Sequence, residues 1–275
     1  MKYFVFKTFI FVLVAIGIFQ IKSYALLKDN KYTKKVLGME VYFAIDKSKK
    51  KNNAKKVLLG DSVGKQMFDS MEDNDTVNSL TSNQAISMAG QYLLLNNYIK
   101  AGNRIDTAYV FFTPFSFANN LDQIYTYNYF VKPFYTSEYM AQMSPIVKNQ
   151  IEKIPFATIA HHPAILTSNW SPEYESDETP EFSFLSPVSV EYLHKMSTLG
   201  KKNGFQLVLI SAPVSKKKRQ DVASLHRDEI ALYNLEEEFK GYFENIMYLD
   251  ESYFSDGTHL IHPEKFKHRY KNLTQ

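Results

Sequence analysis

From Lys56 onward, short and strongly apolar runs alternate with helix-length segments along the chain. The run 107–112, Thr-Ala-Tyr-Val-Phe-Phe, has the strongest β-forming composition, and a second such run is Phe205–Ser211. Apolar runs of this length are typical of strands that are buried on both faces of a parallel sheet. The pattern predicts five strands, at residues 57–59, 76–80, 105–115, 205–211 and 246–249. Helices are expected at 64–71, 85–100, 187–203 and 221–243. We therefore expect one α/β domain over residues 56–275, a three-layer αβα sandwich around a five-stranded parallel sheet.

Two short motifs near the ends of this domain point to chemistry. Gly60-Asp61-Ser62 follows the first expected strand, and Asp256-Gly257-Thr258-His259 lies close to the C-terminus. A serine hydroxyl is a poor nucleophile unless a base takes its proton, and that base needs a group that fixes its tautomer. Either motif alone is an ordinary turn or cap. Together they predict Ser62 as nucleophile, His259 as base and Asp256 as the residue that orients the imidazole.

A strand followed by Gly-Asp-Ser at the front, with Asp-x-x-His at the back, resembles the SGNH (GDSL-like) hydrolases and acyltransferases. The resemblance extends over about residues 56–270, and its specific motifs are confined to the two ends. It implies a flavodoxin-like sheet order and an acyl-enzyme mechanism on Ser62, without a cofactor. It also implies that Ser62, Asp256 and His259 meet beyond the carboxyl ends of the strands. Asp61, beside the nucleophile, is expected to organise the turn.

The family also supplies two oxyanion donors, a glycine after the second strand and an asparagine after the third, and this chain departs from both. After the second strand comes Thr81-Ser82-Asn83, so a backbone amide near Asn83 is the candidate donor. After the third strand, Ser116 aligns best by position and Asn119 is the better donor by type. We expect Asn119 to serve, because an amide holds a fixed N–H donor. These departures are similar to the divergent branch that includes polysaccharide O-acetyltransferases.

A metal site is the competing interpretation of the C-terminal motif. Asp256, His259 and His262 form Asp-x-x-His-x-x-His, and a carboxylate with two imidazoles can bind zinc. Three-residue spacing suits a helix, but Gly257 and Pro263 disfavour a regular helix here. We therefore expect no metal, and we expect His262 to lie in a loop before a C-terminal helix that Pro263 opens. The pair His161-His162 is expected at the surface.

The N-terminal residues 1–24 form a separate unit. Phe4–Ile21 is apolar apart from Lys7, Thr8 and Gln20, and its front carries Lys2 and Lys7. This composition predicts either a cleaved signal peptide or an uncleaved signal anchor, and the anchor is the interpretation that we favour. The expected location is the cell envelope, with the protein exported and held in a membrane by this segment.

Two further segments interrupt the alternating pattern. Residues 25–55 are rich in lysine and are expected to form a basic linker or stalk. Residues 118–187 are rich in aromatic side chains and are expected to be an insertion, which either packs on the core or forms a lid or substrate platform. The chain has no cysteine, so disulfides and thiolate zinc sites are excluded. The net charge is only +3, and no basic face with interleaved aromatics indicates nucleic acid binding.

The functional expectation is an exported, serine-dependent O-acyl transferase or esterase. Its partner would be an acyl donor or an acylated cell-surface polysaccharide, with acetyl as the acyl group. Hydrolysis and transfer share the same acyl-enzyme, so the sequence leaves both open. A non-catalytic module that binds polysaccharide or scaffolds an assembly is the alternative, because a fold can persist without its chemistry.

Overall fold

The computed structural model describes residues 1–28, 30–71, 76–174 and 182–270. A mixed α/β domain surrounds a parallel sheet of four strands, in the order β2-β1-β3-β4. The strands are β1 (Lys56–Gly60), β2 (Val77–Ser79), β3 (Thr107–Phe112) and β4 (Gln206–Ser211). Strand β1 pairs with β3 from Lys56↔Thr107 to Gly60↔Phe111, so the two strands end at the same edge of the sheet. The predicted parallel sheet is thus confirmed for these four strands.

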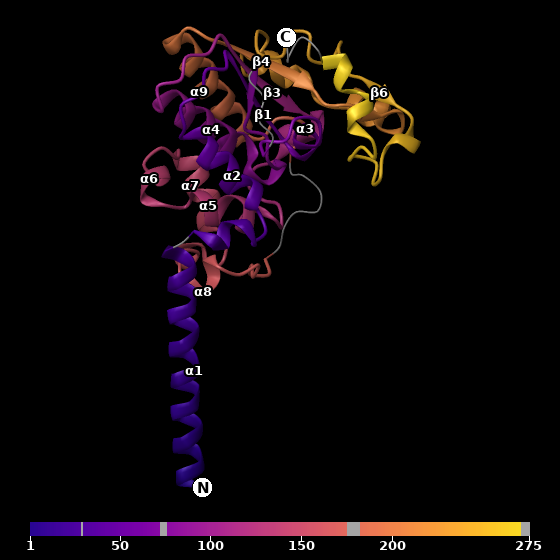
Figure 1. Cartoon of the computed structure of the whole chain (residues 1–275). Helices are drawn as coiled ribbons and strands as arrows, with labels where there is room; N and C mark the ends of the chain where they lie inside the picture. The colour runs from indigo at the N-terminus through magenta and orange to yellow at the C-terminus, as the bar shows by residue number, and fades with distance from the viewer. Residues whose placement is uncertain (29, 72–75, 175–181, 271–275) are drawn as a thin grey trace.

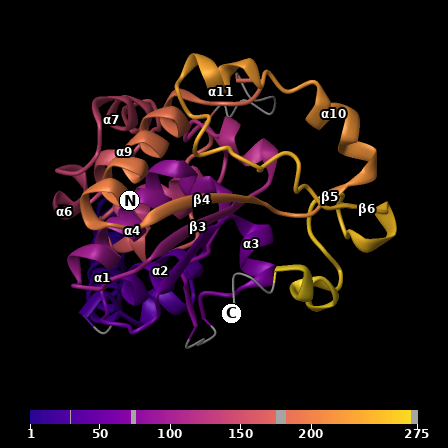
Figure 2. The ribbon, with the colours of Figure 1, turned by 90° about the horizontal axis from the view of Figure 1, so that it is seen from above.

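Successive strand residues point to opposite sides of the sheet. Because successive residues of these strands are apolar, both faces of the sheet are apolar. Val57 and Leu59 face the larger core, where α2 (Met39–Ser48), α4 (Ser87–Lys100) and α9 (Pro187–Asn203) pack. Leu58 and Phe111 face a second core, which contains residues of α3 (Ser62–Met67) and of the C-terminal segment. The second face therefore has a thinner cover than the first. Figure 2 shows α4 and α9 on one side of the sheet and α3 on the other.

The expected fifth strand does not join the sheet. Residues of this region form a separate two-stranded parallel sheet of β5 (Val214–Ser215) and β6 (Tyr248–Leu249). Strand β5 follows β4 after Pro213, which has no N–H to donate to a ladder. The predicted helix 221–243 is also wrong: the chain forms α10 (Arg219–Ala223) and α11 (Asp228–Leu232), and then turns through left-handed residues at Asn234 and Gly241. No long helix returns the chain along β4. The last strand, β6, therefore pairs with β5, the short strand that follows β4, and does not pair with β4 itself.

The expected linker contains a helix of the domain. Helix α1 spans Lys2–Lys28 and is followed by the short turn η1 (Lys31–Lys34) and by α2. Val41 and Ala44 of α2 are fully buried in the larger core, so residues 39–48 belong to the domain. At the start of α2, Gly38 has φ +82°, and a Cβ there would lie 2.8 Å from the carbonyl oxygen of Asn128. The prediction of a linker over 25–55 is therefore wrong for α2, which begins between two lysine-rich stretches.

The aromatic insertion mostly enlarges the core. Tyr127, Phe130, Phe134 and Tyr139 are buried and belong to the same cluster as α4 and α9. Its elements are η4 (Tyr127–Val131), α5 (Lys132–Phe134), α6 (Ser137–Met140), α7 (Pro145–Glu152), η5 (Ala157–Ile159) and α8 (Pro163–Leu166). Residues 175–181 of the insertion lie outside the described part of the chain. The remaining short helices are η2 (Gln84–Ile86), η3 (Pro114–Ala118), η6 (Lys216–Lys218), η7 (Glu251–Tyr253), η8 (Pro263–Lys265) and η9 (Lys267–Tyr270).

Helix α1 projects away from the domain (Figure 1). Among the described residues it is the one helix long and apolar enough to cross a membrane, with a mean hydropathy of 2.3 over its best window, and that window makes no buried contact with the domain. The length and composition of α1 fit a signal anchor or membrane span, and they fit a signal sequence equally well.

Candidate active site

Ser62 lies at a tight turn between β1 and α3. Strand β1 ends at Gly60, and the side chain of Asp61 caps the helix that follows. Asp61 Oδ1 accepts hydrogen bonds from the backbone N–H groups of Val63 at 3.0 Å and Gly64 at 3.1 Å. Such a cap satisfies amides that have no partner within the helix. Ser62 is thereby fixed as the first helical residue, beyond the carboxyl end of β1.

Asp61 also ties this turn to the segment that follows β3. Its Oδ2 accepts from the backbone N–H of Thr113 at 3.0 Å and from the hydroxyl of Ser116 at 2.6 Å. The side chain is buried, and this burial raises the pKa of Asp61, whereas the four hydrogen bonds act in the opposite direction. All four contacts are structural, which agrees with the role in the turn that the sequence suggested.

His259 is held by its own loop. Asp256 Oδ1 accepts from the backbone N–H groups of Thr258 at 3.0 Å and His259 at 2.8 Å, while Oδ2 accepts from His259 Nδ1 at 2.7 Å. Gly257 adopts φ +76°, which lets the loop fold back on the carboxylate. The hydrogen bonds from the backbone and ring of His259 lower the pKa of Asp256 to about 2. An ionised Asp256 therefore holds the proton of the imidazole on Nδ1 and leaves Nε2 as an acceptor.

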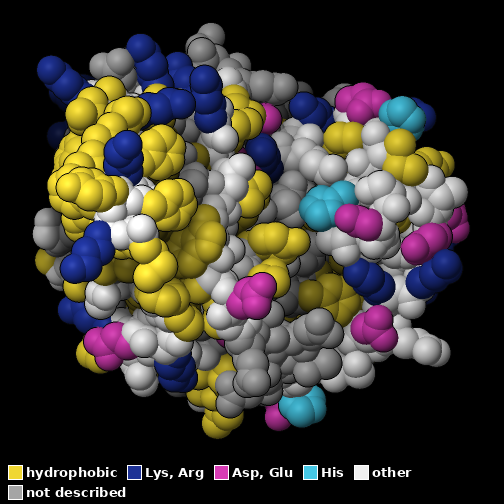
Figure 3. All heavy atoms as spheres, turned by 90° about the horizontal axis from the view of Figure 1, so that it is seen from below, with side chains coloured by type: hydrophobic (Ala, Val, Ile, Leu, Met, Phe, Trp, Pro, Cys, Tyr) yellow, Lys and Arg dark blue, Asp and Glu magenta, His cyan; other side chains and the backbone are white. Residues whose placement is uncertain are grey.

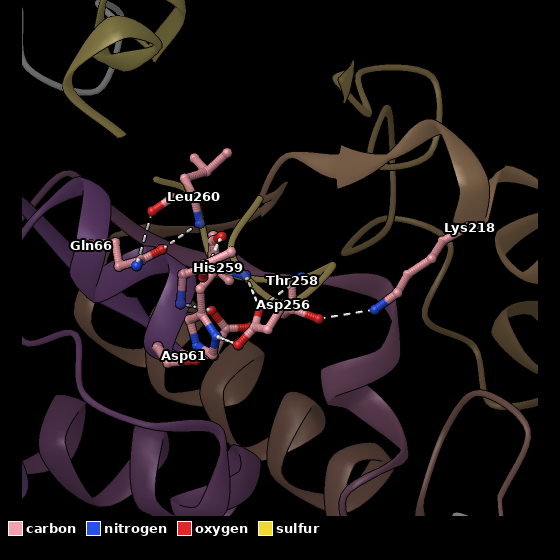
Figure 4. A network of polar contacts seen from close by, with 10 residues as sticks. Asp61, Gln66, Lys218, Asp256, Thr258, His259 and Leu260 are labelled. Carbon is pink, nitrogen blue, oxygen red and sulfur yellow. Dashed lines mark hydrogen bonds and ion pairs between the residues drawn. The ribbon is translucent and has the colours of Figure 1, made fainter. Parts of the chain in front are cut away.

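The structure brings the three predicted residues into one hydrogen-bonded chain. His259 Nε2 lies 2.8 Å from Ser62 Oγ, although the two residues are 197 positions apart. Gln66 of α3 fastens the histidine loop from the other side (Figure 4): its Oε1 accepts from Leu260 N at 2.9 Å, and its Nε2 donates to Leu260 O at 3.3 Å. Lys218 donates to the Thr258 hydroxyl at 2.9 Å. The histidine loop is thus anchored both to the helix of the serine and to the segment after β5.

A cavity of about 320 Å³ opens at the serine and the histidine. It is lined by both acidic and basic side chains, and an ion pair at 3.7 Å joins Glu40 of α2 to Lys65 of α3. The lining residues are Glu40, Ser62, Lys65, Gln66, Asp69, Ser82, His259 and Lys267. Glu40 was assigned to a linker by the sequence, so its place here was missed. None of the described residues of the aromatic insertion lines this cavity, which argues against that part of the insertion as a lid.

The predicted oxyanion side chains are used elsewhere. Asn119 Nδ2 donates to the carbonyl of Gln84, and its Oδ1 accepts from Leu121 N at 2.8 Å. Ser116 donates to Asp61. At Asn83 the predicted donor was a backbone amide, and this stays a prediction; the Asn83 side chain accepts from Ala85 N at 2.9 Å. None of the three lines the described cavity. These side chains stabilise the loops after β2 and β3, and that role depends on contacts that no local motif reveals.

Ser82 is another polar residue of the cavity that sequence reasoning missed. It follows β2, is fully buried, and lines the cavity together with Ser62 and His259. Within the described part of the chain, its hydroxyl is a buried group with no hydrogen-bond partner. Buried hydroxyls are normally paired, so an unpaired one beside a serine and a histidine is a candidate ligand contact. Its position three residues after the end of β2 was the available signal.

The other histidines lie away from this chain of three residues. His262 Nδ1 lies 3.2 Å from Glu264 Oε1 and does not contact Asp256 or His259 in the described contacts. His161 is half-buried, and its Nε2 lies 2.9 Å from the carbonyl oxygen of Lys132. His162 is exposed and caps α8. After His262 the chain forms 3-10 turns where a C-terminal helix was expected.

The fold and the site therefore define a mixed α/β protein with a Ser–His–Asp hydrogen-bonded chain at the carboxyl ends of parallel strands. No family model and no curated protein matches the chain. One solved structure, from Streptococcus pneumonia, is provisionally described as a platelet activating factor. It has 13% sequence identity and a TM-score of 0.34, with 91% of this chain and 98% of that chain covered.

Proposed function

We propose that this protein is a serine-dependent O-acyl transferase or esterase. The observation that carries the proposal is the continuous chain from Ser62 through His259 to Asp256, with contacts of 2.8 and 2.7 Å. An ionised carboxylate, an imidazole with its acceptor nitrogen free for the hydroxyl, and a serine at a capped turn are the parts that acyl transfer requires.

The finer assignment that we propose is a divergent member of the SGNH (GDSL-like) hydrolases and acyltransferases. It is supported by the Gly60-Asp61-Ser62 turn after the first strand, by Asp256 and His259 near the C-terminus, and by the parallel order β2-β1-β3-β4. The displaced fifth strand and the engaged Asn119 side chain are departures from that family. They favour the branch with loosened motifs, which the sequence also indicated.

In the proposed reaction Ser62 Oγ attacks the carbonyl carbon of an ester while His259 Nε2 takes the hydroxyl proton. The tetrahedral intermediate collapses, the carbon–oxygen bond to the leaving group breaks, and His259 returns the proton to that oxygen. We assign the Ser82 hydroxyl as a donor to the oxyanion, because it is buried and unpaired among the described residues, and because Ser82 is one of the residues that line the same cavity. Water or a second hydroxyl then attacks the acyl-Ser62 ester while His259 takes its proton; the bond from the acyl carbon to Ser62 Oγ breaks, and His259 returns the proton to Ser62 Oγ.

We propose an acetyl ester of a cell-surface polysaccharide as the substrate. The apolar helix α1 supports an exported protein held at a membrane, and the small polar cavity suits a short acyl group on a hydrophilic partner. Whether water or a sugar hydroxyl accepts the acyl group decides between esterase and transferase.

The test is incubation of the full-length protein with an activated acetyl ester, with and without an added glycan, followed by mass spectrometry. Acetylation of the Ser62 peptide, and its absence in Ser62→Ala, would support the proposal. Acetyl found on the glycan would identify a transferase, and free acetate alone would identify an esterase. Release of acetate at the same rate by wild type and Ser62→Ala would refute the enzyme assignment.

One observation favours a second candidate, a non-catalytic module that binds polysaccharide. The Asn119 and Ser116 side chains are committed to structural hydrogen bonds, so both candidates for the expected side-chain donor after β3 are engaged elsewhere. Binding of glycan fragments with equal affinity by wild type and His259→Ala, with no turnover in either, would favour this candidate. Turnover that depends on His259 would exclude it.

A further inference from the structure

A group of exposed apolar side chains lies where α1 joins the domain. We define the basal surface as Leu37, Phe156, Ile159 and Trp170, which are 44%, 56%, 48% and 46% exposed. Side chains of this size are usually covered, and an exposed group of them marks an interaction surface. The group lies apart from the cavity at Ser62, so the proposed chemistry does not account for it.

Direct contacts join these residues into one surface. The rings of Phe156 and Trp170 lie 5.8 Å apart at 64°. Asn169 Oδ1, next to Trp170, accepts from the backbone N–H of Leu37 at 2.8 Å. The buried Lys132 donates to the carbonyl of Trp170 at 2.7 Å and so fixes its backbone. Ile159 ends the turn η5 that Phe156 precedes.

Helix α1 sets the position of this surface relative to a bilayer. Its stretch from Phe4 to Ile21, apolar apart from Lys7, Thr8 and Gln20, is about 27 Å long at about 1.5 Å per residue, close to the roughly 30 Å of a hydrocarbon core. At the end of this stretch, Gln20 Nε2 lies 3.5 Å from His162 Nε2, next to α8. Ser23 of α1 is buried. Figure 1 shows α8 beside the last turns of α1, at the end of the domain from which α1 projects. The basal surface therefore lies at the level where the apolar stretch ends.

The chemistry of the surroundings fits the boundary of a membrane. Five lysines and one aspartate lie between Gln20 and Gly38: Lys22, Lys28, Lys31, Lys34, Lys35 and Asp29. Lysines beside a membrane are attracted to anionic headgroups, and tryptophan is enriched at the interface between water and lipid. Figure 3 looks along α1 from its free end; the hydrophobic side chains on that half of the face include those of α1 itself, and Lys and Arg side chains lie around them.

We propose that the basal surface lies in the headgroup region of an anionic phospholipid bilayer that α1 spans. The domain is then seated directly on the membrane, in one orientation, and is not a globule on a flexible tether. Helix α2 packs into the core within a few residues of η1, and this short connection is consistent with a fixed seat.

Trp170 is the single tryptophan of the chain, so its fluorescence tests the seat directly. The full-length protein is reconstituted into phosphatidylglycerol–phosphatidylcholine vesicles whose acyl chains carry bromine close to the headgroups. Flotation through a density gradient first establishes whether α1 holds the protein in the vesicles. Bromolipids are expected to quench Trp170 at least twofold relative to unbrominated vesicles, and aqueous iodide is expected to quench it little.

Two variants control the measurement. Trp170→Phe/Leu232→Trp moves the tryptophan to α11, which lies across the domain from α1 in Figure 2, and Leu232 is 69% exposed. This variant should be open to iodide and insensitive to bromolipids. Phe156→Asn removes an exposed aromatic at a residue with φ +60°, a conformation that asparagine tolerates. It should stay folded by circular dichroism and lose at least half of the bromolipid quenching.

Each other outcome contradicts the inference. If the protein floats with the vesicles but Trp170 is quenched by iodide and not by bromolipids, α1 anchors the protein and the basal surface does not lie in the headgroup region. Trp170 protected from both quenchers would place a second copy or another protein on the basal surface. Failure to float would refute the span, and the seat with it. None of these results depends on the reaction at Ser62, so the proposed function is tested separately.

Discussion

Gln66 should control turnover by holding the histidine loop in place, and Gln66→Met tests this. Its two hydrogen bonds to the backbone of Leu260, at 2.9 and 3.3 Å, hold the histidine loop against the helix that begins at Ser62. Each bond contributes about 1 kcal/mol, so the substitution weakens the docking of His259 by about 2 kcal/mol. That free energy corresponds to a change of roughly 30-fold in the equilibrium constant between the docked and the undocked histidine loop.

The loop should remain folded in this variant, because Phe254 and Leu260 are buried in the second core and Asp256 still holds His259. We therefore expect kcat to fall by about 10- to 30-fold, with KM little changed and the melting temperature lowered by at most about 8 °C. Hydrolysis of an activated acetyl ester measures kcat and KM separately. Gln220→Met on the exposed side of α10 is the matched control and should leave both constants unchanged. A kcat within twofold of wild type in Gln66→Met would show that the clamp does not position His259.

Three further predictions concern Ser82, Asp61 and Lys132. Ser82→Ala should lower kcat for ester hydrolysis by about 10²–10³-fold, as loss of one oxyanion donor does. Asn119→Ala should mainly lower the stability of the fold. A large loss of kcat in Asn119→Ala and a small one in Ser82→Ala would instead assign Asn119 as the donor. Asp61→Asn should lower the free energy of unfolding by about 1–3 kcal/mol, because the NH₂ group of the new amide would face N–H or O–H donors that a carboxylate oxygen now accepts from. Equal denaturant midpoints in wild type and variant would contradict this. Burial lowers the pKa of Lys132 to about 8, so the folded chain binds this proton less than the unfolded chain does. Wild type should therefore gain up to about 3 kcal/mol of stability relative to Lys132→Met as the pH rises from about 8 to 10.5, and a constant difference in urea unfolding would refute it.

The sequence was sufficient for the parts of the fold that rest on local pattern. Buried runs such as Thr107–Phe112 predicted a parallel sheet of five strands, of which four are present in the structure, and the helix predicted at Pro187–Asn203 has those bounds. Ser62, Asp256 and His259 lie together because each belongs to a turn that the local residues specify. Their roles in a reaction remain predictions that the experiments above test.

The parts that failed depend on contacts between distant segments. Helix α2 lies between lysine-rich stretches and is recognisable only from Val41 and Ala44 in the core. The charged segment 221–243 has helical periodicity, but left-handed turns at Asn234 and Gly241 break it, and the last strand is displaced as a result. The donor group of Asn119 is committed to the carbonyl of Gln84, 35 residues away, so side-chain type alone misassigned its role.

The most direct test of the central claim is the rate at which a fluorophosphonate labels Ser62 in the full-length protein, read by intact and peptide mass spectrometry. The probe forms a stable bond to a serine oxygen only where that oxygen is activated as a nucleophile. We expect one phosphonyl group per chain on Ser62 in wild type and none in Ser62→Ala. The rate should fall by at least 10²-fold in His259→Ala, because His259 takes the serine proton. Absence of labelling in the folded wild-type protein, or an unchanged rate in His259→Ala, would contradict the account.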